Sequence, residues 1–339
     1  MIAMQLSDPG PVTTDRLTLA HIDEIAPGPD QVLIDIEACA MCRTDLQIAT
    51  GDVPSHRLPL TPGHQVIGRI RAVGSAIDRA RIGTRVGLAW IANACGECRF
   101  CLDGRENLCY RAAFTGWDVD GGYAQQVVAE SRFAFDLAPL QDRSSQSIAP
   151  LMCAGVIGYR ALRIAELGAA SSGARLGLYG YGASARQVLQ MARHWGVDVY
   201  VATRSDQEAQ SALEAGAVWA GSYTDRPPAP LDAAITFAPV GSIVAEAVKS
   251  LDRGGIVAIN AIHLDELPAM NYDDLWWERS IRSVANVTSQ DVGEFIELAA
   301  QIDLKTDYEL LDLEDANEGL RRIESGSVRG SFVLRPPGR

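Results

Sequence analysis

The chain has 339 residues, more than a single hydrophobic core usually supports, so we expect two domains. Hydrophobic residues make up 47% and charged residues 22% of the chain, which excludes a disordered or fibrous protein. The formal net charge is −13 and no basic run occurs, which argues against a nucleic-acid partner because binding to phosphate backbones depends on clustered Lys and Arg.

Neither a targeting segment nor a membrane span is indicated. Residues 1–6 lack a positive region followed by an apolar segment. The most apolar later stretch, residues 148–159, stops at Arg160, short of the roughly 18 residues that a span needs. We therefore expect a cytoplasmic protein with reduced thiols and no membrane partner.

The first part of the chain has the pattern of an all-β, barrel-like unit. From Leu17 to Leu60, short strand-like runs alternate with Pro and Gly breaks. Residues 1 to about 150 are thus predicted to form one β-rich unit. Its strands are expected at Val32–Ile36, Val66–Gly74, Arg85–Leu88 and Gly121–Val128.

A cysteine-rich run interrupts these strands. Cys95, Cys98, Cys101 and Cys109 follow one another with the spacing Cys-x2-Cys-x2-Cys-x7-Cys. One tight loop could therefore supply the closed tetrahedron of thiolates that structural zinc requires. Disulfides or unrelated buried thiols are the alternatives, but disulfides suit small secreted scaffolds, and no export signal is present.

After a predicted buried helix over Ser147–Gly168, strands alternate with helices, which predicts a parallel, doubly wound sheet. The strands are expected at Arg175–Tyr179, Val197–Thr203, Ala217–Ala220, Ala233–Phe237, Gly255–Ala261 and Ile281–Val287, and the helices near Ser184–Trp195, Gln207–Ala215 and Ser242–Leu251. The last fifty or so residues are predicted to return to the first unit, with helices at Val292–Ile302 and Leu313–Ser325 and a closing strand at Ser331–Leu334.

A glycine-rich turn follows the first of these strands. Gly180, Gly182 and Ala185 form a G-x-G-x-x-A pattern that opens a helix. The first glycine permits the tight turn, the second lets the backbone approach a pyrophosphate, and the small third residue allows close packing of helix on strand. At this place in the α/β pattern, the motif indicates a nicotinamide cofactor.

Three further metal-ligating residues are scattered. Cys42, His64 and Cys153 could leave a fourth position open, as catalytic zinc requires. Spacing alone favours the alternative that Cys153 is a core thiol and His64 a hydrogen-bonded turn histidine.

Together and in this order, these motifs resemble those of the medium-chain zinc-dependent alcohol dehydrogenases, and the likeness runs over essentially the whole chain. It includes Gly121-Gly122-Tyr123-Ala124 and Gly326-Ser327-Val328-Arg329-Gly330. The resemblance implies an α/β fold with a GroES-like β-barrel catalytic domain (1–151 and 287–339) that carries a structural zinc lobe (94–110). A doubly wound Rossmann domain (152–286) is implied to bind the dinucleotide.

The resemblance also implies individual roles. Cys42, His64 and Cys153 match catalytic zinc ligands, and the four clustered cysteines match structural ones, so two zinc ions per chain are expected. Thr44 matches the hydroxyl that binds the substrate oxygen, and Asp45 the carboxylate that orients the ligand histidine. Arg43 and Arg329 match positions that contact the cofactor. Trp90 and Trp117 match positions that line the substrate pocket, although either tryptophan could be barrel core.

Two positions depart from the family pattern, and one cysteine has no assigned role. Gln65 replaces a glutamate that usually follows the ligand histidine, so a negative charge near the metal is missing. Gln47 replaces a histidine that often ends the proton relay, and its amide cannot titrate near neutral pH. Cys39 is expected to be a buried thiol on a strand.

The end of the second predicted Rossmann strand favours NADP(H) over NAD(H). NAD-specific relatives place an acidic residue there, which repels a 2′-phosphate, but this chain has Thr203. Arg204 follows and could grip a phosphate, while Thr203 and Ser205 add neutral donors. Arg204 could alternatively stack on the adenine or point to solvent.

We therefore predict a zinc-dependent alcohol dehydrogenase that transfers a hydride between a primary or secondary alcohol and a nicotinamide cofactor. A polyol or sugar dehydrogenase of the same fold is one alternative, which the tryptophans disfavour because they suggest an apolar pocket. A non-catalytic zinc-stabilised nucleotide binder, with Gln65 and Gln47 marking a decayed site, is the other. The expected partners are a small alcohol or aldehyde and further copies of the chain, as a dimer or tetramer.

Overall fold

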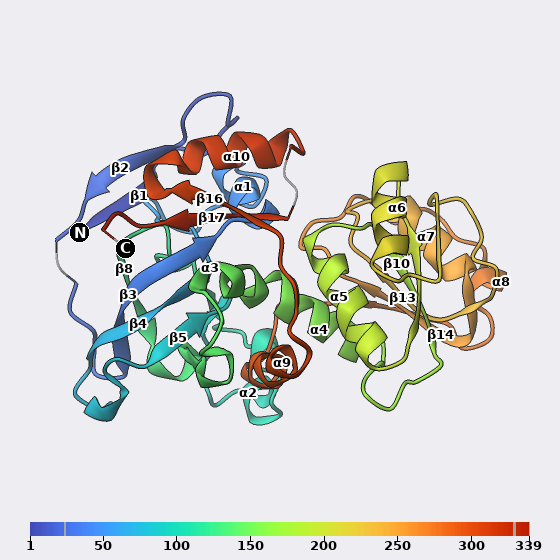
Figure 1. Ribbon diagram of the computed structural model, residues 1–339, viewed down its shortest axis with the longest axis horizontal. Coiled ribbons are helices and arrows are strands. Elements are labelled where there is room, and N and C mark those ends of the chain that lie inside the picture. Colours follow the sequence, from blue (N-terminus) through green and yellow to red (C-terminus); the bar gives the residue numbers. More distant parts are fainter. Residues whose placement is uncertain (24, 328–329, 339) are drawn as a thin grey trace. The chain divides into compact units, whose positions relative to one another are not determined.

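The computed structural model describes residues 1–23, 25–327 and 330–338. Contacts divide the chain into two compact units (Figure 1). The first unit joins Met1–Cys153 with Asn286–Arg339, and the second is Ala154–Ala285. Arg329, expected to contact the cofactor, lies outside the described residues.

The first unit is built on a mixed sheet in the order β16-β17-β3-β4-β5-β9, with β8 pairing on β3. Val32, Ile34 and Ile36 of β3 are buried in its hydrophobic core. A separate hairpin of β1 and β2 is tied to the rest by bridges from Ala3 to Ala124 and from Leu6 to Leu60. The strands are β1 (Ile2–Leu6), β2 (Leu17–His21), β3 (Gln31–Ala40), β4 (Gln65–Val73), β5 (Arg85–Leu88), β6 (Ile91–Asn93), β7 (Ala113–Phe114), β8 (Gln126–Glu130), β9 (Phe135–Asp136), β16 (Tyr308–Asp312) and β17 (Ser331–Arg335).

Helices of this unit cover parts of the sheet and carry the cysteine-rich run. They are α1 (Arg43–Thr50), α2 (Arg99–Leu102), α3 (Ser145–Ile148), α9 (Ser289–Ile302) and α10 (Ala316–Glu324), with short 3-10 turns between. The all-β prediction for residues 17–60 was wrong at α1. Cys42 caps this helix by accepting from the backbone N–H of Thr44, and Gly51 ends it with a φ of 87°.

The second unit contains a six-stranded parallel sheet in the order β12-β11-β10-β13-β14-β15, which confirms the predicted doubly wound fold. The strand order reverses between β10 and β13, which is where such folds bind ligands, at the carboxyl ends of the strands. Its elements are α4 (Ala154–Ile164), β10 (Arg175–Tyr179), α5 (Ala183–His194), β11 (Asp198–Ala202), α6 (Asp206–Glu214), β12 (Trp219–Gly221), β13 (Leu231–Thr236), α7 (Gly241–Lys249), β14 (Leu251–Ile259), α8 (Tyr272–Leu275) and β15 (Ser280–Ser283).

The single buried helix predicted over Ser147–Gly168 is interrupted. The 3-10 turn η5 (Ala149–Met152) follows α3, and Cys153 then leaves helical geometry with φ −125° and ψ −70° before α4 begins. Pro150 contributes because it has no N–H to donate. The helical run Ser145–Ile164 is long and apolar enough to cross a membrane, contrary to the predicted short stretch, but 61% of its most apolar part is buried, as in a core helix.

The strand predicted at Gly121–Val128 begins only at Gln126. Residues 121–123 instead donate their backbone N–H groups to the loop before β4. These hydrogen bonds take the place of the strand-to-strand hydrogen bonds that were expected. The predicted strand was therefore wrong over its first half.

Asn317 ties α10 to the strand β2. Its Oδ1 accepts from the N–H groups of Arg16 and Leu17 at 3.1 and 3.0 Å, and its Nδ2 donates to the Leu17 carbonyl at 2.8 Å. The side chain is nearly buried, so removing it leaves backbone groups without partners.

We expect Asn317→Ala to lower the free energy of unfolding by about 2–3 kcal/mol, because buried backbone groups would lose their partners. Urea unfolding followed by circular dichroism measures this loss. Gln290→Ala, at an exposed position of α9, is the matched control, and equal stability losses in the two variants would contradict the prediction.

Candidate functional site

Three predicted metal ligands converge in the first unit. Cys42 stands at the N-terminus of α1, His64 lies just before β4, and Cys153 lies at the break after η5. Their ligand atoms all lie within 4.8 Å of one another. The Cys42 Sγ and the His64 Nε2 are 3.3 Å apart. The structure thus brings together two thiols and one imidazole from three distant parts of the chain.

A buried carboxylate orients this histidine. Asp45 is fully buried, and its Oδ2 accepts from the Cys42 N–H at 2.8 Å. Its Oδ1 lies 3.2 Å from the His64 Nδ1, an ion-pair distance without the alignment of a good hydrogen bond. The Nδ1 therefore faces the carboxylate, while the Nε2 faces the thiols, as a metal-ligating imidazole requires.

The pKa values of the three donors are shifted by their contacts with one another. A hydrogen bond from Cys153 lowers the pKa of Cys42 to about 5, with further help from the charge of His64, against the effect of burial. The same hydrogen bond and burial raise the pKa of Cys153. Burial alone would lower the pKa of His64, but Cys42 and Asp45 raise it. The lowered pKa of Cys42 favours its thiolate form, and a bound cation would displace the remaining protons.

The cysteine-rich run forms a second cluster of donors. The Sγ atoms of Cys95, Cys98, Cys101 and Cys109 also lie within 4.8 Å of one another. The Sγ of Cys101 lies 3.8 Å from that of Cys95 and 3.6 Å from that of Cys98, too far for a disulfide, and all seven cysteines are free. Backbone N–H groups at Glu97 and Cys98 lower the pKa of Cys95 to about 6. This closed set of four thiols fits a tetrahedral zinc ion.

Thr44 and Gln47 lie one turn apart on α1, and Arg43 is exposed at its first position. Gln65 is buried, and its Nε2 donates to the Ala40 carbonyl at 3.2 Å. Cys39 is buried on β3, where the sequence pattern placed it.

An aromatic cluster adjoins the imidazole. The Trp90 ring centroid lies 5.9 Å from those of His64 and Trp117 and 5.1 Å from that of Phe114. Both tryptophans are partly exposed, which argues against a purely core role, and the buried Nε1 of Trp90 has no hydrogen-bond partner. Sequence reasoning missed Phe114, whose short strand β7 carries no motif.

The glycine-rich turn of the second unit has the expected local geometry. Gly180 follows β10 with a φ of 100°, which favours glycine. Gly182 precedes α5 with open space where a Cβ would stand, and Ala185 is fully buried in that helix. The backbone can therefore approach a pyrophosphate at this helix N-terminus.

An acidic side chain that was not expected lies at the end of β11. Thr203 is buried, and its hydroxyl donates to the carboxylate of Glu208 on the first turn of α6. Ser205 caps the same helix by accepting from the Glu208 N–H at 3.3 Å. Arg204 is exposed. Sequence reasoning missed Glu208 because it stands five residues beyond Thr203, on a helix rather than at the strand end.

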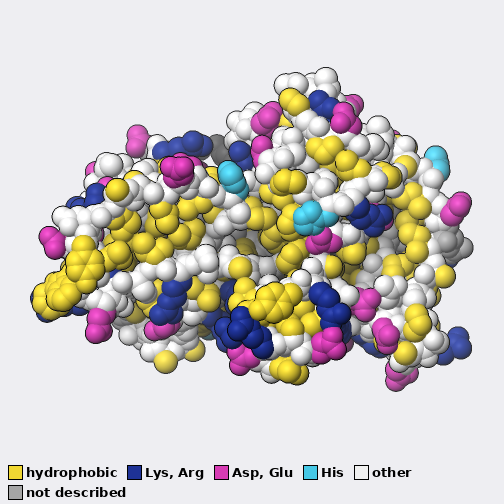
Figure 2. Space-filling model, turned by 180° about the vertical axis from the view of Figure 1, so that it is seen from behind, with side chains coloured by type: hydrophobic (Ala, Val, Ile, Leu, Met, Phe, Trp, Pro, Cys, Tyr) yellow, Lys and Arg dark blue, Asp and Glu magenta, His cyan; other side chains and the backbone are white. Residues whose placement is uncertain are grey.

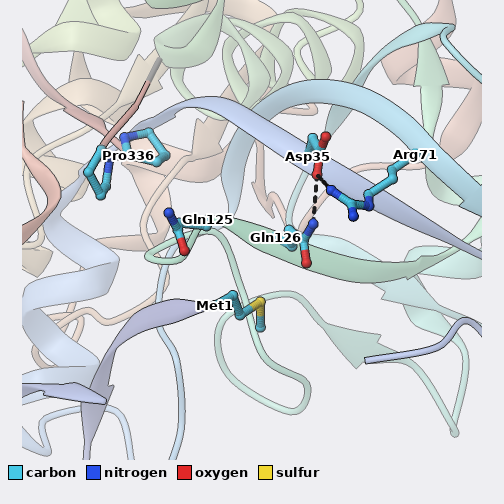
Figure 3. Close-up of a pocket in the computed structure, with 7 residues that line it drawn as sticks. Met1, Asp35, Arg71, Gln125, Gln126 and Pro336 are labelled. Carbon is cyan, nitrogen blue, oxygen red and sulfur yellow. Dashed lines mark hydrogen bonds and ion pairs between the residues drawn. The ribbon is translucent and has the colours of Figure 1, made fainter. Parts of the chain in front are cut away.

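A cavity of about 350 Å³ in the first unit lies apart from these thiols (Figure 3). The Asp35 carboxylate in it is already paired: Gln126 Nε2 donates to it at 2.8 Å, and Arg71 lies 3.7 Å from it. It contains no cysteine or histidine, so the chemistry belongs to the converging thiols.

The structure has the features of a zinc-type dehydrogenase fold. These are two thiol clusters, one of them with an oriented histidine, and a doubly wound sheet with a glycine-rich turn. Residues 28–139 match the alcohol dehydrogenase GroES-like domain family. The chain is 43% identical to the probable alcohol dehydrogenase AdhA of Mycobacterium tuberculosis, over 98% of this chain and 97% of that protein. It is 33% identical to an alcohol dehydrogenase of Geobacillus stearothermophilus, over 90% of this chain and 91% of that one. The chain belongs to the medium-chain zinc alcohol dehydrogenase family and is an alcohol dehydrogenase.

Solved structures share the fold over the whole chain. The cobalt- and zinc-bound thermostable alcohol dehydrogenase of Pyrobaculum aerophilum matches with a TM-score of 0.88 at 21% identity, covering 99% of each chain. The CAD of Helicobacter pylori complexed with NADP(H) matches with a TM-score of 0.87 at 21% identity, covering 98% of this chain and 97% of that one. The GroES-like plus Rossmann-like architecture predicted from the sequence is confirmed.

Proposed function

We propose that the enzyme is a zinc-dependent, NADP(H)-preferring dehydrogenase of primary or secondary alcohols, with two zinc ions per chain. The observation that supports this most strongly is the convergence of Cys42, His64 and Cys153 with the Asp45 carboxylate behind the imidazole. The first unit would then be the catalytic domain and the second the dinucleotide-binding domain.

In this proposal zinc supplies Lewis acidity to the substrate oxygen, and the nicotinamide accepts or gives the hydride. The chain's own residues orient the metal ligand and bind the substrate. Asp45 fixes the orientation of His64, and Thr44, two residues after Cys42, holds the substrate hydroxyl and its proton. Trp90, Phe114 and Trp117 would contact the apolar part of the substrate, which favours an aryl or alkyl alcohol over a polyol.

The apolar surface of the second unit supports the proposal of a homo-oligomer. Apolar side chains are plentiful on the face seen in Figure 2, and exposed aromatic and aliphatic residues of this unit include Ile262, Leu267, Tyr272, Trp276 and Trp277. The two tryptophans are about half exposed, so they do not pack a core in the single chain. Light scattering of the purified protein tests this assembly. A cytoplasmic location, expected from the sequence, stays part of the proposal.

Elemental analysis should find two zinc ions in the parent and one in each of Cys98→Ser and Cys153→Ser. We expect Cys98→Ser to lose thermal stability, since ligation of structural zinc contributes folding free energy. Cys153→Ser should lose alcohol oxidation while keeping the melting temperature of the parent. One zinc ion in the fully loaded parent would contradict the two-site proposal.

The cofactor preference depends on two opposing charges at the end of β11. Arg204 is exposed and could bind a 2′-phosphate, whereas the Glu208 carboxylate that accepts from Thr203 would repel it. We expect the arginine contact, about 1.5–3 kcal/mol, to favour NADPH by roughly ten- to a hundredfold.

The decisive experiment measures kcat/KM for NADPH and NADH over a panel of aldehydes, together with fluorescence titration of both cofactors. The Thr203→Asp variant should have a higher kcat/KM for NADH and a lower kcat/KM for NADPH than the parent. Glu208→Gln should raise the NADPH preference, and Glu214→Gln, exposed on the same helix, should leave it unchanged. A preference of the parent enzyme for NADH would overturn the proposed NADP(H) preference. Cofactor binding without turnover of any aldehyde would favour the alternative of a non-catalytic nucleotide binder.

Gln47→His should raise alcohol oxidation, because an imidazole one turn beyond Thr44 can accept the proton that the amide cannot. A positioned base is worth about 10²–10⁴-fold, and we expect the lower end for a terminal relay member. The gain should be largest near pH 7 and small at high pH, where hydroxide is plentiful. Gln47→Asn is the control, and pH–rate profiles that coincide for the histidine and asparagine variants would show that the relay does not pass this residue.

A further inference from the structure

The loop that carries His64 is bound by a second segment, residues 121–123, which have no role in the chemistry described above. The N–H of Gly121 donates to the Thr61 carbonyl at 2.7 Å, that of Gly122 to Gly63 at 2.8 Å, and that of Tyr123 to Pro62 at 3.0 Å. Three successive residues thus bind the three residues that precede the histidine.

Glycine is required for this close approach. A Cβ on Gly121 would lie 2.0 Å from the Gly63 carbonyl oxygen. A Cβ on Gly122 would lie 2.3 Å from a methyl group of Val66 and 2.8 Å from the Cys39 Sγ. Any larger residue would therefore push the His64 loop and this segment apart.

The Tyr123 ring fills the space beneath the same loop. Tyr123 is fully buried, and a Cβ on Gly63 would lie 2.3 Å from its Cδ1. Gly63 also has a φ of 98°, which favours glycine. The ring and the loop therefore fix each other's position directly beside the histidine.

The Tyr123 hydroxyl is buried, and its electrostatic surroundings include the carboxylate that faces His64. It has no well-aligned hydrogen-bond partner, and neither has the Oδ1 of the fully buried Asp45. Burial, followed by the charge of Asp45, raises the pKa of Tyr123, so the phenol keeps its proton. The site thus holds a buried donor and a buried acceptor that both lack a well-aligned partner, and buried groups of this kind are normally paired.

We propose that Gly121–Tyr123 is the positioning element of the His64 ligand, in which the Tyr123 hydroxyl donates to Asp45 while the carboxylate accepts from the metal-bound imidazole. This proposal rests on the proposed zinc role of Cys42, His64 and Cys153. The tyrosine does not touch the substrate. It acts through Asp45, by holding the carboxylate in the orientation that presents the His64 Nε2 to the metal.

Loss of a partner behind a ligand histidine typically costs about 10- to 100-fold in metal affinity. Tyr123 stands one step further from the metal than Asp45, so we expect the lower end, about tenfold, for Tyr123→Phe. The phenylalanine ring keeps the contact with Gly63, so the variant tests the hydroxyl alone.

The experiment is a Co²⁺ titration, in competition with a chelator, of protein that retains metal in the four-cysteine lobe. The thiolate-to-cobalt absorption band reports occupancy without any measurement of turnover. Tyr179→Phe is the matched control, since Tyr179 is also buried, its hydroxyl also lacks a well-aligned partner, and it lies in the other unit. We expect about a tenfold weaker affinity in Tyr123→Phe and an unchanged one in Tyr179→Phe.

A double-mutant cycle separates positioning from a general loss of stability. In an Asp45→Asn background, Tyr123→Phe should have no further effect on cobalt affinity, because its partner is already altered. Equal losses in both backgrounds, or an affinity of Tyr123→Phe within twofold of the parent, would overturn the proposal. Failure of the parent itself to bind cobalt at the three-donor site would instead overturn the proposed zinc role.

Discussion

The geometry of the site depends on one buried carboxylate. Asp45 accepts from the Cys42 N–H with one oxygen and faces the His64 Nδ1 with the other. Because it stands at the third position of α1, the same side chain completes the cap of that helix. A local folding requirement and the orientation of a metal ligand are therefore met by a single residue, which couples the start of α1 to the His64 loop.

The sequence predicted the arrangement of side chains best where they are concentrated in a short segment. Local backbone turns determine where the side chains of a short segment point. This applies to the four cysteines within fifteen residues and to the glycine-rich turn after an apolar run. The alternation of strands and helices after residue 175 likewise predicted the parallel sheet. Cys42, His64 and Cys153 lie far apart in the chain, and only the family resemblance indicated that they meet.

The errors arose where tertiary contacts override local pattern. Helix α1 was missed because the signal that starts it is a cysteine cap with an aspartate three residues later, and cysteine is not among the usual N-cap residues. The strand predicted from Gly121 begins late because the N–H groups of residues 121–123 donate to the His64 loop. Glu208 was missed because a helix returns it to the end of β11, a contact with no signature in the preceding strand. The last two errors concern residues whose partners lie on another element.

The substitution at position 65 is intelligible from the charges around it. Gln65 is buried and donates to the Ala40 carbonyl, which an ionised glutamate could not do. Two thiolates would neutralise a divalent ion, and Asp45 would leave the buried site with one negative charge. A glutamate at position 65 would add a second negative charge in the same low-dielectric surroundings, where an unpaired charge is costly. The amide therefore fills the position with a satisfied hydrogen bond and leaves Asp45 as the carboxylate that His64 faces, held by the Cys42 N–H.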